Sequence, residues 1–237
     1  MSFGARPQAD KDADTPAQSW TRVNASGVDY LRLPLHTRWL DETDDLTLAL
    51  KESLALAKPG DTVAISEKVA ILLTGRTVDI STMQPGRLAQ FLAHHVHPRT
   101  DSKGLSVAEK MEYVIRTVGY RRIIAASIGS AVTRPLGMHG AFYRLAGPIA
   151  RDVDGGRPPY EHVLFPPFDV KVAQRVCADL ERALDIGVSI VDLNDYGGSI
   201  RAVSPQSLSA ETLATVLSDN PLGQRLTSTP FVLVRPA

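Results

Sequence analysis

Residues 188–201 read VSIVDLNDYGGSIR. The β-prone run 188–191 ends at an acid, which predicts a buried strand that carries polar side chains where it ends. Asp192, Asn194 and Asp195 offer hard oxygen ligands of the kind that Mg²⁺ and Mn²⁺ prefer. Asn, Asp and Gly are also the usual residues of a tight turn, so the alternative interpretation of this segment is an ordinary hairpin.

Two glycines and an arginine complete this segment. Gly197 and Gly198 lack a Cβ, so their backbone N–H groups can approach a phosphate closely. Arg201 can bind a carboxylate through two parallel hydrogen bonds. The segment therefore combines candidate contacts to a metal ion, a phosphate and a carboxylate.

Helical and strand patterns mix without strict alternation on both sides of this segment. Asp169 precedes apolar residues at helical spacing, which predicts a helix over 170–184 that buries Cys177 and ends at Gly187. Further patterns predict helices at 46–57, 84–96, 106–118 and 210–217, strands at 28–35, 123–128, 141–146, 200–203 and 231–234, and apolar runs at 63–65 and 69–73. These elements predict a mixed α/β (α+β) fold, with mixed sheets and packed helices.

The chain is long enough for one large domain or two small ones. Residues 1–27 are polar and without periodicity, which predicts a disordered or loosely attached tail. We expect residues 28–237 to form the folded domain. It can be divided into two intertwined α/β subdomains, at about 28–150 and 151–237.

The charges of the chain balance, because 26 Lys and Arg face 26 Asp and Glu. This balance argues against a nucleic acid held through its phosphate charge. No apolar run approaches the roughly 18 residues of a membrane span, and the N-terminal residues lack the pattern of a secretory signal. The single cysteine excludes an internal disulfide. We expect a cytoplasmic protein with neither a nucleic-acid nor a membrane partner.

Four other residues carry weaker signals. Lys68 lies between two apolar runs, so it either contacts an anion or is an exposed strand residue. Gln224 can offer an amide carbonyl to a metal or nucleotide, although a helix end is the simpler explanation of its context. His94 and His97 can share a helical face, but the end of a helix also suits histidines.

The order of these residues resembles that of the coenzyme F(420)-0:γ-glutamyl ligase family over most of residues 30–236. The segments that carry the resemblance are, in chain order, Asp44-Asp45-Leu46, Gly60 to Lys68, Gly75-Arg76, Phe142 to Gly147, Leu164 to Asp169, Ile190 to Gly197, Gly223-Gln224 and Pro230 to Arg235. This chain departs from the family at Pro148-Ile149, where the family has an Asp that Asp152 or Asp154 would replace. It also has Asn194-Asp195 in place of the family's Asp-Thr.

The resemblance implies a homodimeric enzyme with a mixed α/β fold that joins glutamate to a carboxylate acceptor through an acyl phosphate, using GTP and two divalent cations (Mg²⁺ or Mn²⁺). It implies a metal-binding cage of Asp192, Asn194, Asp195 and Gln224, with Asp154 as a further ligand. It implies nucleotide contacts from Asp44, Asp45, Gly197, Gly198 and Gln224, and catalytic roles for Lys68, Asp195 and Arg201. Two alternatives remain: a ligase for a different acid and amine in specialised metabolism, and a non-catalytic protein that binds a nucleotide or metabolite.

Overall fold

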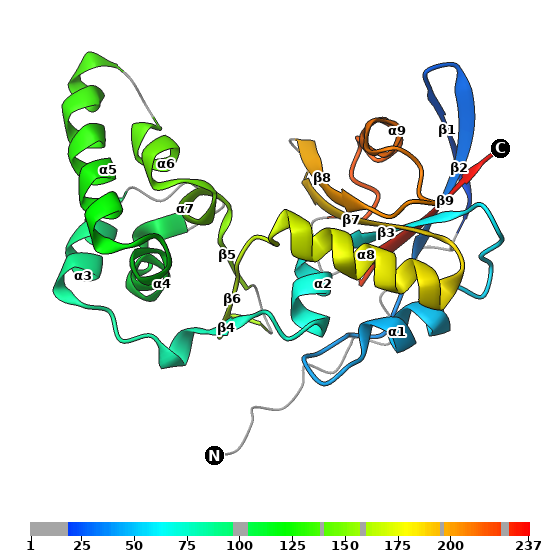
Figure 1. The fold of residues 1–237 in the computed structure, drawn as a ribbon, viewed down its shortest axis with the longest axis horizontal. Coiled ribbons are helices and arrows are strands. Elements are labelled where there is room, and N and C mark those ends of the chain that lie inside the picture. Colours follow the sequence, from blue (N-terminus) through cyan, green and yellow to red (C-terminus); the bar gives the residue numbers. More distant parts are fainter. Residues whose placement is uncertain (1–18, 97–103, 138–139, 157–159, 195–196, 224–227) are drawn as a thin grey trace. The chain divides into compact units, whose positions relative to one another are not determined.

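The computed structural model describes residues 19–96, 104–137, 140–156, 160–194, 197–223 and 228–237 (Figure 1). These residues separate into two compact units. The smaller unit spans residues 76–167, and the larger unit combines residues 19–75 with residues 168–237. The chain therefore passes between the units at residues 75–76 and 167–168, whereas the sequence suggested a division near residue 150. The predicted mixed α/β fold is confirmed.

The larger unit is built on a six-stranded mixed sheet with the strand order β1-β2-β9-β3-β7-β8. Only β3 and β7 run parallel, and the other neighbouring strands of this sheet pair antiparallel. The strands are β1 (Thr21–Ala25), β2 (Val28–Leu35), β3 (Thr62–Ser66), β7 (Gly187–Asn194), β8 (Gly197–Val203) and β9 (Phe231–Pro236). Because β1 lies within residues 1–27, the predicted tail is wrong for residues 21–25.

The central strands β3 and β9 are buried on both faces, as continuous apolar runs predict. Ala64, Val191 and Val232 pack against α9 on one side of the sheet, and α8 contacts β7 and β8. Figure 1 shows α8 and α9 on opposite sides of this sheet. The helices of the larger unit are α1 (Leu46–Ser53), α2 (Glu67–Leu73), α8 (Val170–Leu184) and α9 (Ala210–Val216).

Helix α8 confirms the clearest prediction from the sequence. The Asp169 carboxylate accepts a hydrogen bond from the backbone N–H of Val172 at 3.1 Å, and so caps the helix. The helix ends at Leu184 and is followed by Asp185 in the left-handed conformation, and Gly187 begins β7 instead of ending the helix. Cys177 is buried as expected, and burial raises the pKa of its thiol to about 12. This thiol is therefore a packing group without nucleophilic character at neutral pH.

The smaller unit is mainly helical and also contains a three-stranded sheet with the order β4-β6-β5. Its core joins apolar side chains from α3, α4, α5, α6 and α7 with Leu164 of β6. The strands are β4 (Val78–Asp79), β5 (Asp154–Gly155) and β6 (Val163–Phe165). The helices are α3 (Arg87–His94), α4 (Ala108–Val118), α5 (Tyr120–Thr133), α6 (Ala141–Ala146) and α7 (Pro148–Asp152), with 3-10 turns at Ile80–Thr82, Gly104–Ser106 and Arg134–Leu136.

Three stretches that the sequence marked as strands or apolar runs are helical. Residues 123–128 lie within α5, residues 141–146 form α6, and residues 69–73 lie within α2. In α5, Ile123 and Ala126 are buried while Ile124 is exposed, which is the three-residue spacing of a helix that rests on a core. Among the described helices, none is long and apolar enough to cross a membrane.

A buried carboxylate in the smaller unit predicts a pH-dependent stability. Glu112 on α4 accepts hydrogen bonds from the backbone N–H of Gly86 at 3.0 Å and from Nε of Arg116 at 2.7 Å. Burial alone would raise its pKa, but these two donors outweigh burial and hold the pKa below its usual value of 4.5. The charged form is thus favoured by folding, and its contribution is present above about pH 4.5 and is lost as pH falls through the lowered pKa.

Glu112→Gln is expected to lower the free energy of unfolding by about 1–3 kcal/mol near neutral pH, because the charged acceptor is lost. Urea unfolding followed by circular dichroism checks this near pH 7 and again near pH 3. The gap between the wild type and the variant should shrink at the lower pH. An equal gap at both values would show that the charge of Glu112 contributes nothing.

Candidate functional site

Several segments of the larger unit end or begin at one edge of the six-stranded sheet. The strand registers align Leu35 with Phe231, Phe231 with Ile65, and Ile65 with Ile190. As a result β2 and β3 end at this edge, β7 continues past it, and β9 begins there. We call it the carboxyl edge, because the parallel strands β3 and β7 point their carboxyl ends toward it. In sheets that contain parallel strands, ligands commonly bind outside these ends.

Most of the predicted site residues follow or flank the strands at the carboxyl edge. Lys68 lies in the first turn of α2, directly after β3. The acids before α1 follow β2 after a short loop, and the remaining residues lie on the β7–β8 hairpin. The eight residues are Asp44, Asp45, Lys68, Asp192, Asn194, Gly197, Gly198 and Arg201. The topology therefore places residues that are up to 157 positions apart in the sequence, from Asp44 to Arg201, along one edge of the sheet.

The centre of the carboxyl edge is a buried ion pair between Arg201 and Glu67. Nε of Arg201 lies 2.9 Å from Oε1 of Glu67, and Nη2 donates a hydrogen bond to Oε2 at 3.1 Å. The side chain of Glu67 is 6% exposed, and its carboxylate also accepts a hydrogen bond from the backbone N–H of Phe168 at 2.8 Å. We expected Arg201 to bind a substrate carboxylate, but in the structure its partner is this internal carboxylate.

Arg201 also connects the buried pair to the acidic end of β7. Its Nη2 lies 4.0 Å from Oδ2 of Asp192, whose side chain is 46% exposed. Asp192 and Asn194 are two residues apart on β7, so their side chains lie on the same face of the sheet. Glu67 is the site residue that we did not predict from the sequence. Its position directly after a buried strand and beside Lys68 was the available signal.

The β7–β8 segment is the hairpin that the sequence offered as the simpler alternative. Asp192 pairs with Ser199, and Asn194 pairs with Gly197. A Cβ at Gly198 would lie 2.6 Å from the carbonyl oxygen of Asp192, so the hairpin itself requires this glycine. Hairpin and ligand site are compatible, because Asp192 and Asn194 present their oxygens from the strand that the hairpin holds in place.

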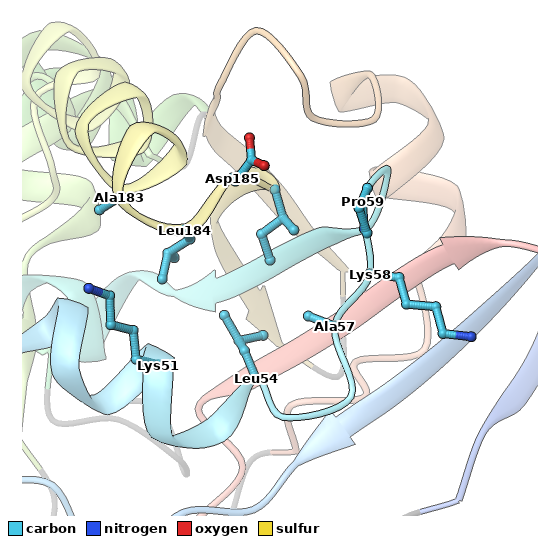
Figure 2. Close-up of a pocket in the computed structure, with 9 residues that line it drawn as sticks. Lys51, Leu54, Ala57, Lys58, Pro59, Ala183, Leu184 and Asp185 are labelled. Atoms are coloured by element: carbon cyan, nitrogen blue, oxygen red, sulfur yellow. The ribbon is translucent and has the colours of Figure 1, made fainter.

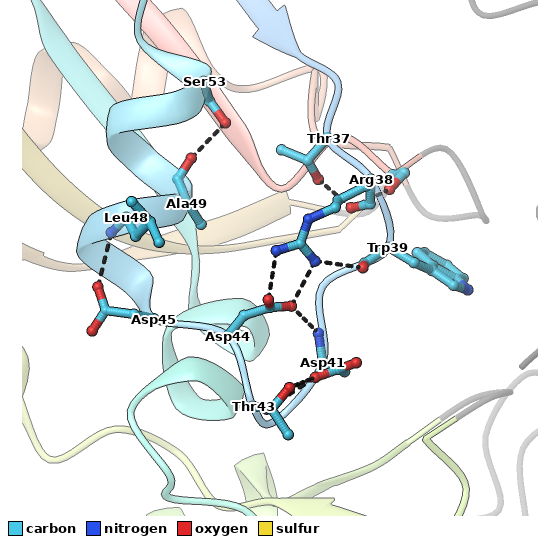
Figure 3. A network of polar contacts seen from close by, with 11 residues as sticks. Thr37, Arg38, Trp39, Asp41, Thr43, Asp44, Asp45, Leu48, Ala49 and Ser53 are labelled. Carbon is cyan, nitrogen blue, oxygen red and sulfur yellow. Dashed lines mark hydrogen bonds and ion pairs between the residues drawn. The ribbon is translucent and has the colours of Figure 1, made fainter.

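The two acids before α1 have internal partners (Figure 3). Asp44 receives hydrogen bonds from both terminal nitrogens of Arg38, at 2.9 and 2.5 Å, and from the backbone N–H of Asp41 at 2.7 Å. This contact raises the pKa of the Arg38 guanidinium. Asp45 caps α1 by accepting a hydrogen bond from the backbone N–H of Leu48 at 2.8 Å. Both carboxylates therefore organise the loop after β2, and any nucleotide contact would be additional to these bonds.

Two hollows of the larger unit lie at opposite edges of the sheet. The smaller, of about 200 Å³, lies next to the carboxyl edge and is lined by His36, Thr37, Arg38, Leu40, Ala49, Glu52 and Ser53. The larger, of about 340 Å³, is lined by the residues that precede β3 and β7, at the amino ends of these strands. Figure 2 shows Lys58 at its margin with its side chain directed away from Leu54 and Leu184. We place the site at the carboxyl edge, because oxygen ligands and cations converge there.

Two described side chains at the carboxyl edge could bind a metal ion. The side chains of Asp192 and Asn194 carry oxygens of the type that Mg²⁺ prefers, and Mg²⁺ in proteins commonly takes one or two carboxylates beside phosphate and water. Within the described ranges, no three His, Cys, Asp or Glu side chains form a group that could hold a metal ion. This donor set fits a cation that is bound together with a phosphate, and it does not form a closed protein cage.

The remaining predicted residues lie either outside the described residues or in the smaller unit. Asp195, Gln224 and His97 lie outside the described residues. Asp154 belongs to the smaller unit, where its carboxylate accepts a hydrogen bond from the backbone N–H of Gly155 at 3.1 Å. Asp152, the other substitute for the family's acid, forms an ion pair with Arg151 at 2.6 Å.

No family model matches the chain, and no curated protein matches it. A functional assignment therefore depends on the chemistry of the carboxyl edge and on the ordered segments that carry the resemblance described above.

Proposed function

We propose that this chain is an amide ligase that depends on a nucleoside triphosphate and a divalent cation. It joins an amino acid, glutamate by the resemblance, to a carboxylate acceptor with GTP and Mg²⁺ or Mn²⁺. The observation that supports the proposal is the convergence of Lys68, Asp192 and Asn194 at the carboxyl edge. Cations and oxygen ligands on one edge suit a triphosphate together with its metal ion.

The reaction has two displacement steps. An oxygen of the acceptor carboxylate attacks the γ-phosphorus of GTP, the bond to the bridging oxygen breaks, and GDP leaves. The amine nitrogen of the amino acid then attacks the acyl carbon, the carbon–oxygen bond to phosphate breaks, and the nitrogen loses a proton. The triphosphate, the acceptor carboxylate and the carboxylate of the amino acid are all anionic. The site must therefore neutralise the negative charge that concentrates on the transferred phosphoryl group.

Residues of α2, β7 and β8 would meet this requirement. Lys68 is an exposed cation beside the end of β3, and it is the candidate contact for a phosphate or carboxylate. Asp192 and Asn194 are the ligands for a divalent cation, which supplies the remaining positive charge when it is bound. Arg201 is a positioning residue, because it binds Glu67 and lies beside Asp192. From β2 to β7 the edge spans three strand spacings, roughly 14 Å.

Calorimetric titration of GTP into the Mn²⁺-loaded protein tests the proposal. Asp192→Asn and Asp195→Ala are each expected to weaken GTP binding by at least about tenfold, a loss of about 1.4 kcal/mol, because a charged metal ligand is removed. Asp185→Asn is the matched control at the opposite edge of the sheet, and it should leave the affinity unchanged. Unchanged affinity in both site variants would contradict the proposal.

Phosphate release separates the proposed ligase from the alternatives. The wild type should release phosphate only when GTP, an acceptor acid and an amino acid are all present. Release with amino acids other than glutamate would indicate a ligase for a different acid and amine. Ligand-induced shifts of the melting temperature without release in any mixture would indicate a binding protein instead of an enzyme.

A further inference from the structure

Helix α5 of the smaller unit presents an apolar face to solvent. Beyond its first turn, every exposed side chain of α5 is apolar. Ile128 and Val132 are 61% and 64% exposed, and Leu145 of the neighbouring α6 is 49% exposed. The exposed residues of this face, which we call the α5 face, are Tyr120, Ile124, Ala125, Ile128, Ala131, Val132 and Leu145. Half of the exposed large hydrophobic residues in the described part of the chain belong to it, five of ten. A contiguous apolar surface of this kind marks an interaction site.

The α5 face is held rigidly on α6. The two helices lie side by side (Figure 1), and Nε of Arg122 donates a hydrogen bond to the carbonyl oxygen of Leu145 at 2.7 Å. A Cβ at Gly129 would lie 2.7 Å from Cδ1 of Leu145, so the absence of a side chain at this position allows the close contact. Leu145 is therefore half exposed although it belongs to a closely packed pair of helices.

The charged residues of the segment that contains α5 and α6 are all arginines. Residues 113–151 contain six arginines and no Asp, Glu or Lys, and two of these arginines, Arg116 and Arg151, pair with Glu112 and Asp152 just outside the segment. Arg121, Arg134 and Arg144 are exposed and form no ion pair with any residue that the structure describes. The face therefore fits a partner that is apolar in its interior and anionic at its surface.

A second copy of the chain is a poor match for this face. Antiparallel pairing of α5 with itself about the midpoint of Tyr120–Thr133 would bring Arg134 of one copy within two residues of Arg121 of the other. No acidic side chain within residues 113–151 would compensate this repulsion.

We propose that the α5 face binds the surface of an anionic lipid bilayer. The apolar side chains insert at the boundary of the headgroups, and Arg121, Arg134 and Arg144 bind lipid phosphates. Helix α5 has 14 residues, about 21 Å in length, and so lies in the plane of the interface instead of crossing it. The proposal revises the expectation of no membrane partner, because the absence of a long apolar run argues only against a segment that spans the membrane. It is independent of the proposed ligase activity.

Co-sedimentation of the full chain with vesicles tests this proposal. The wild type should sediment with vesicles of phosphatidylcholine that contain about 30% phosphatidylglycerol, and at least about tenfold less with pure phosphatidylcholine. The double variant Ile128→Glu/Val132→Glu should lose at least about tenfold of the binding, because two charges enter the apolar face. Leu48→Glu is the matched control, since Leu48 is a similarly exposed leucine on α1, at 56%.

Each variant is first checked for a wild-type melting temperature and circular dichroism spectrum. The triple variant Arg121→Gln/Arg134→Gln/Arg144→Gln leaves the apolar face intact and should lose the preference for anionic vesicles. Equal sedimentation of the wild type and the double variant would overturn the proposal. A wild-type dimer that dissociates in the double variant, without vesicle binding by either, would also overturn it and assign the α5 face to self-association.

Discussion

Arg201→Met is expected to lower the free energy of unfolding by about 3–5 kcal/mol, because it leaves the carboxylate of Glu67 buried without a counter-charge. Glu67 is nearly fully buried, and after this substitution its remaining described donor is the backbone N–H of Phe168. Burying an uncompensated charge is among the largest penalties that a single substitution can cause. Urea unfolding monitored by circular dichroism measures the loss.

Two further variants show that the loss arises from the buried pair. Arg182→Met removes an arginine from the exposed ion pair with Asp179 on α8, and it should cost less than about 1 kcal/mol. The double variant Glu67→Gln/Arg201→Met should be more stable than Arg201→Met alone, because it removes the orphaned charge and keeps an acceptor for Phe168. If Arg201→Met costs no more than Arg182→Met, Arg201 has no role in stabilising the carboxyl edge.

Arg235→Met is expected to have a similarly large effect, about 3–5 kcal/mol, because Asp61 would keep a buried charge. Nε and Nη2 of Arg235 each donate a hydrogen bond to the Asp61 carboxylate at 2.7 Å. Asp61 is 1% exposed, and this contact raises the pKa of the Arg235 guanidinium. Nη2 also donates to the carbonyl oxygen of Leu56 at 2.9 Å, and the guanidinium stacks on Trp20 at 4.7 Å. Urea unfolding monitored by circular dichroism also measures this loss in the free energy of unfolding.

The matched control for Arg235→Met lies on the same sheet. Arg22 forms an ion pair with Asp29 at 3.0 Å, but these two side chains are 66% and 40% exposed to solvent. Arg22→Met should therefore change the free energy of unfolding by less than about 1 kcal/mol. Equal losses in the two variants would mean that burial of Asp61 does not determine the effect.

The sequence predicted those elements whose signals are local and repeated. Helix α8 combines a capping aspartate with apolar residues at helical spacing, and both signals appear in the structure. The strands β2, β7 and β9 are apolar runs bounded by turn residues, and they form where we expected them. In each case, neighbouring residues carry enough information to define the element.

The prediction was wrong where a short apolar run suits either a strand or a helix. Residues 123–128 contain three isoleucines, and their local preference favours a strand. In the structure Ile123 and Ala126 face the core of the smaller unit, so tertiary packing selects a helix. Because this segment is a helix with Ile123 and Ala126 on the core, Ile124 and Ile128 are exposed. No local pattern in the sequence indicated their exposure.

The sequence predicted which residues lie at the candidate site better than it predicted the contacts between them. The oxygen-bearing residues at the end of β7 are visible in the sequence, because they follow a buried strand. The pairing of Arg201 with Glu67 joins residues 134 positions apart, and it depends on β3 and β7 being neighbours in the sheet. Composition and periodicity contain no information about which strands become neighbours, so the pairing of Glu67 with Arg201 could not be predicted from the sequence.

The place of β9 in the sheet has a consequence for biosynthesis. This strand lies between β2 and β3, although it is made of residues 231–236. While the ribosome elongates the chain, 195 residues must follow β2 and 164 residues must follow β3 before their shared neighbour β9 begins to emerge. The contiguous segment 76–167 leaves the exit tunnel during this delay. The nascent polypeptide therefore exposes unpaired strand edges for most of its translation, which is the situation in which chaperones are needed.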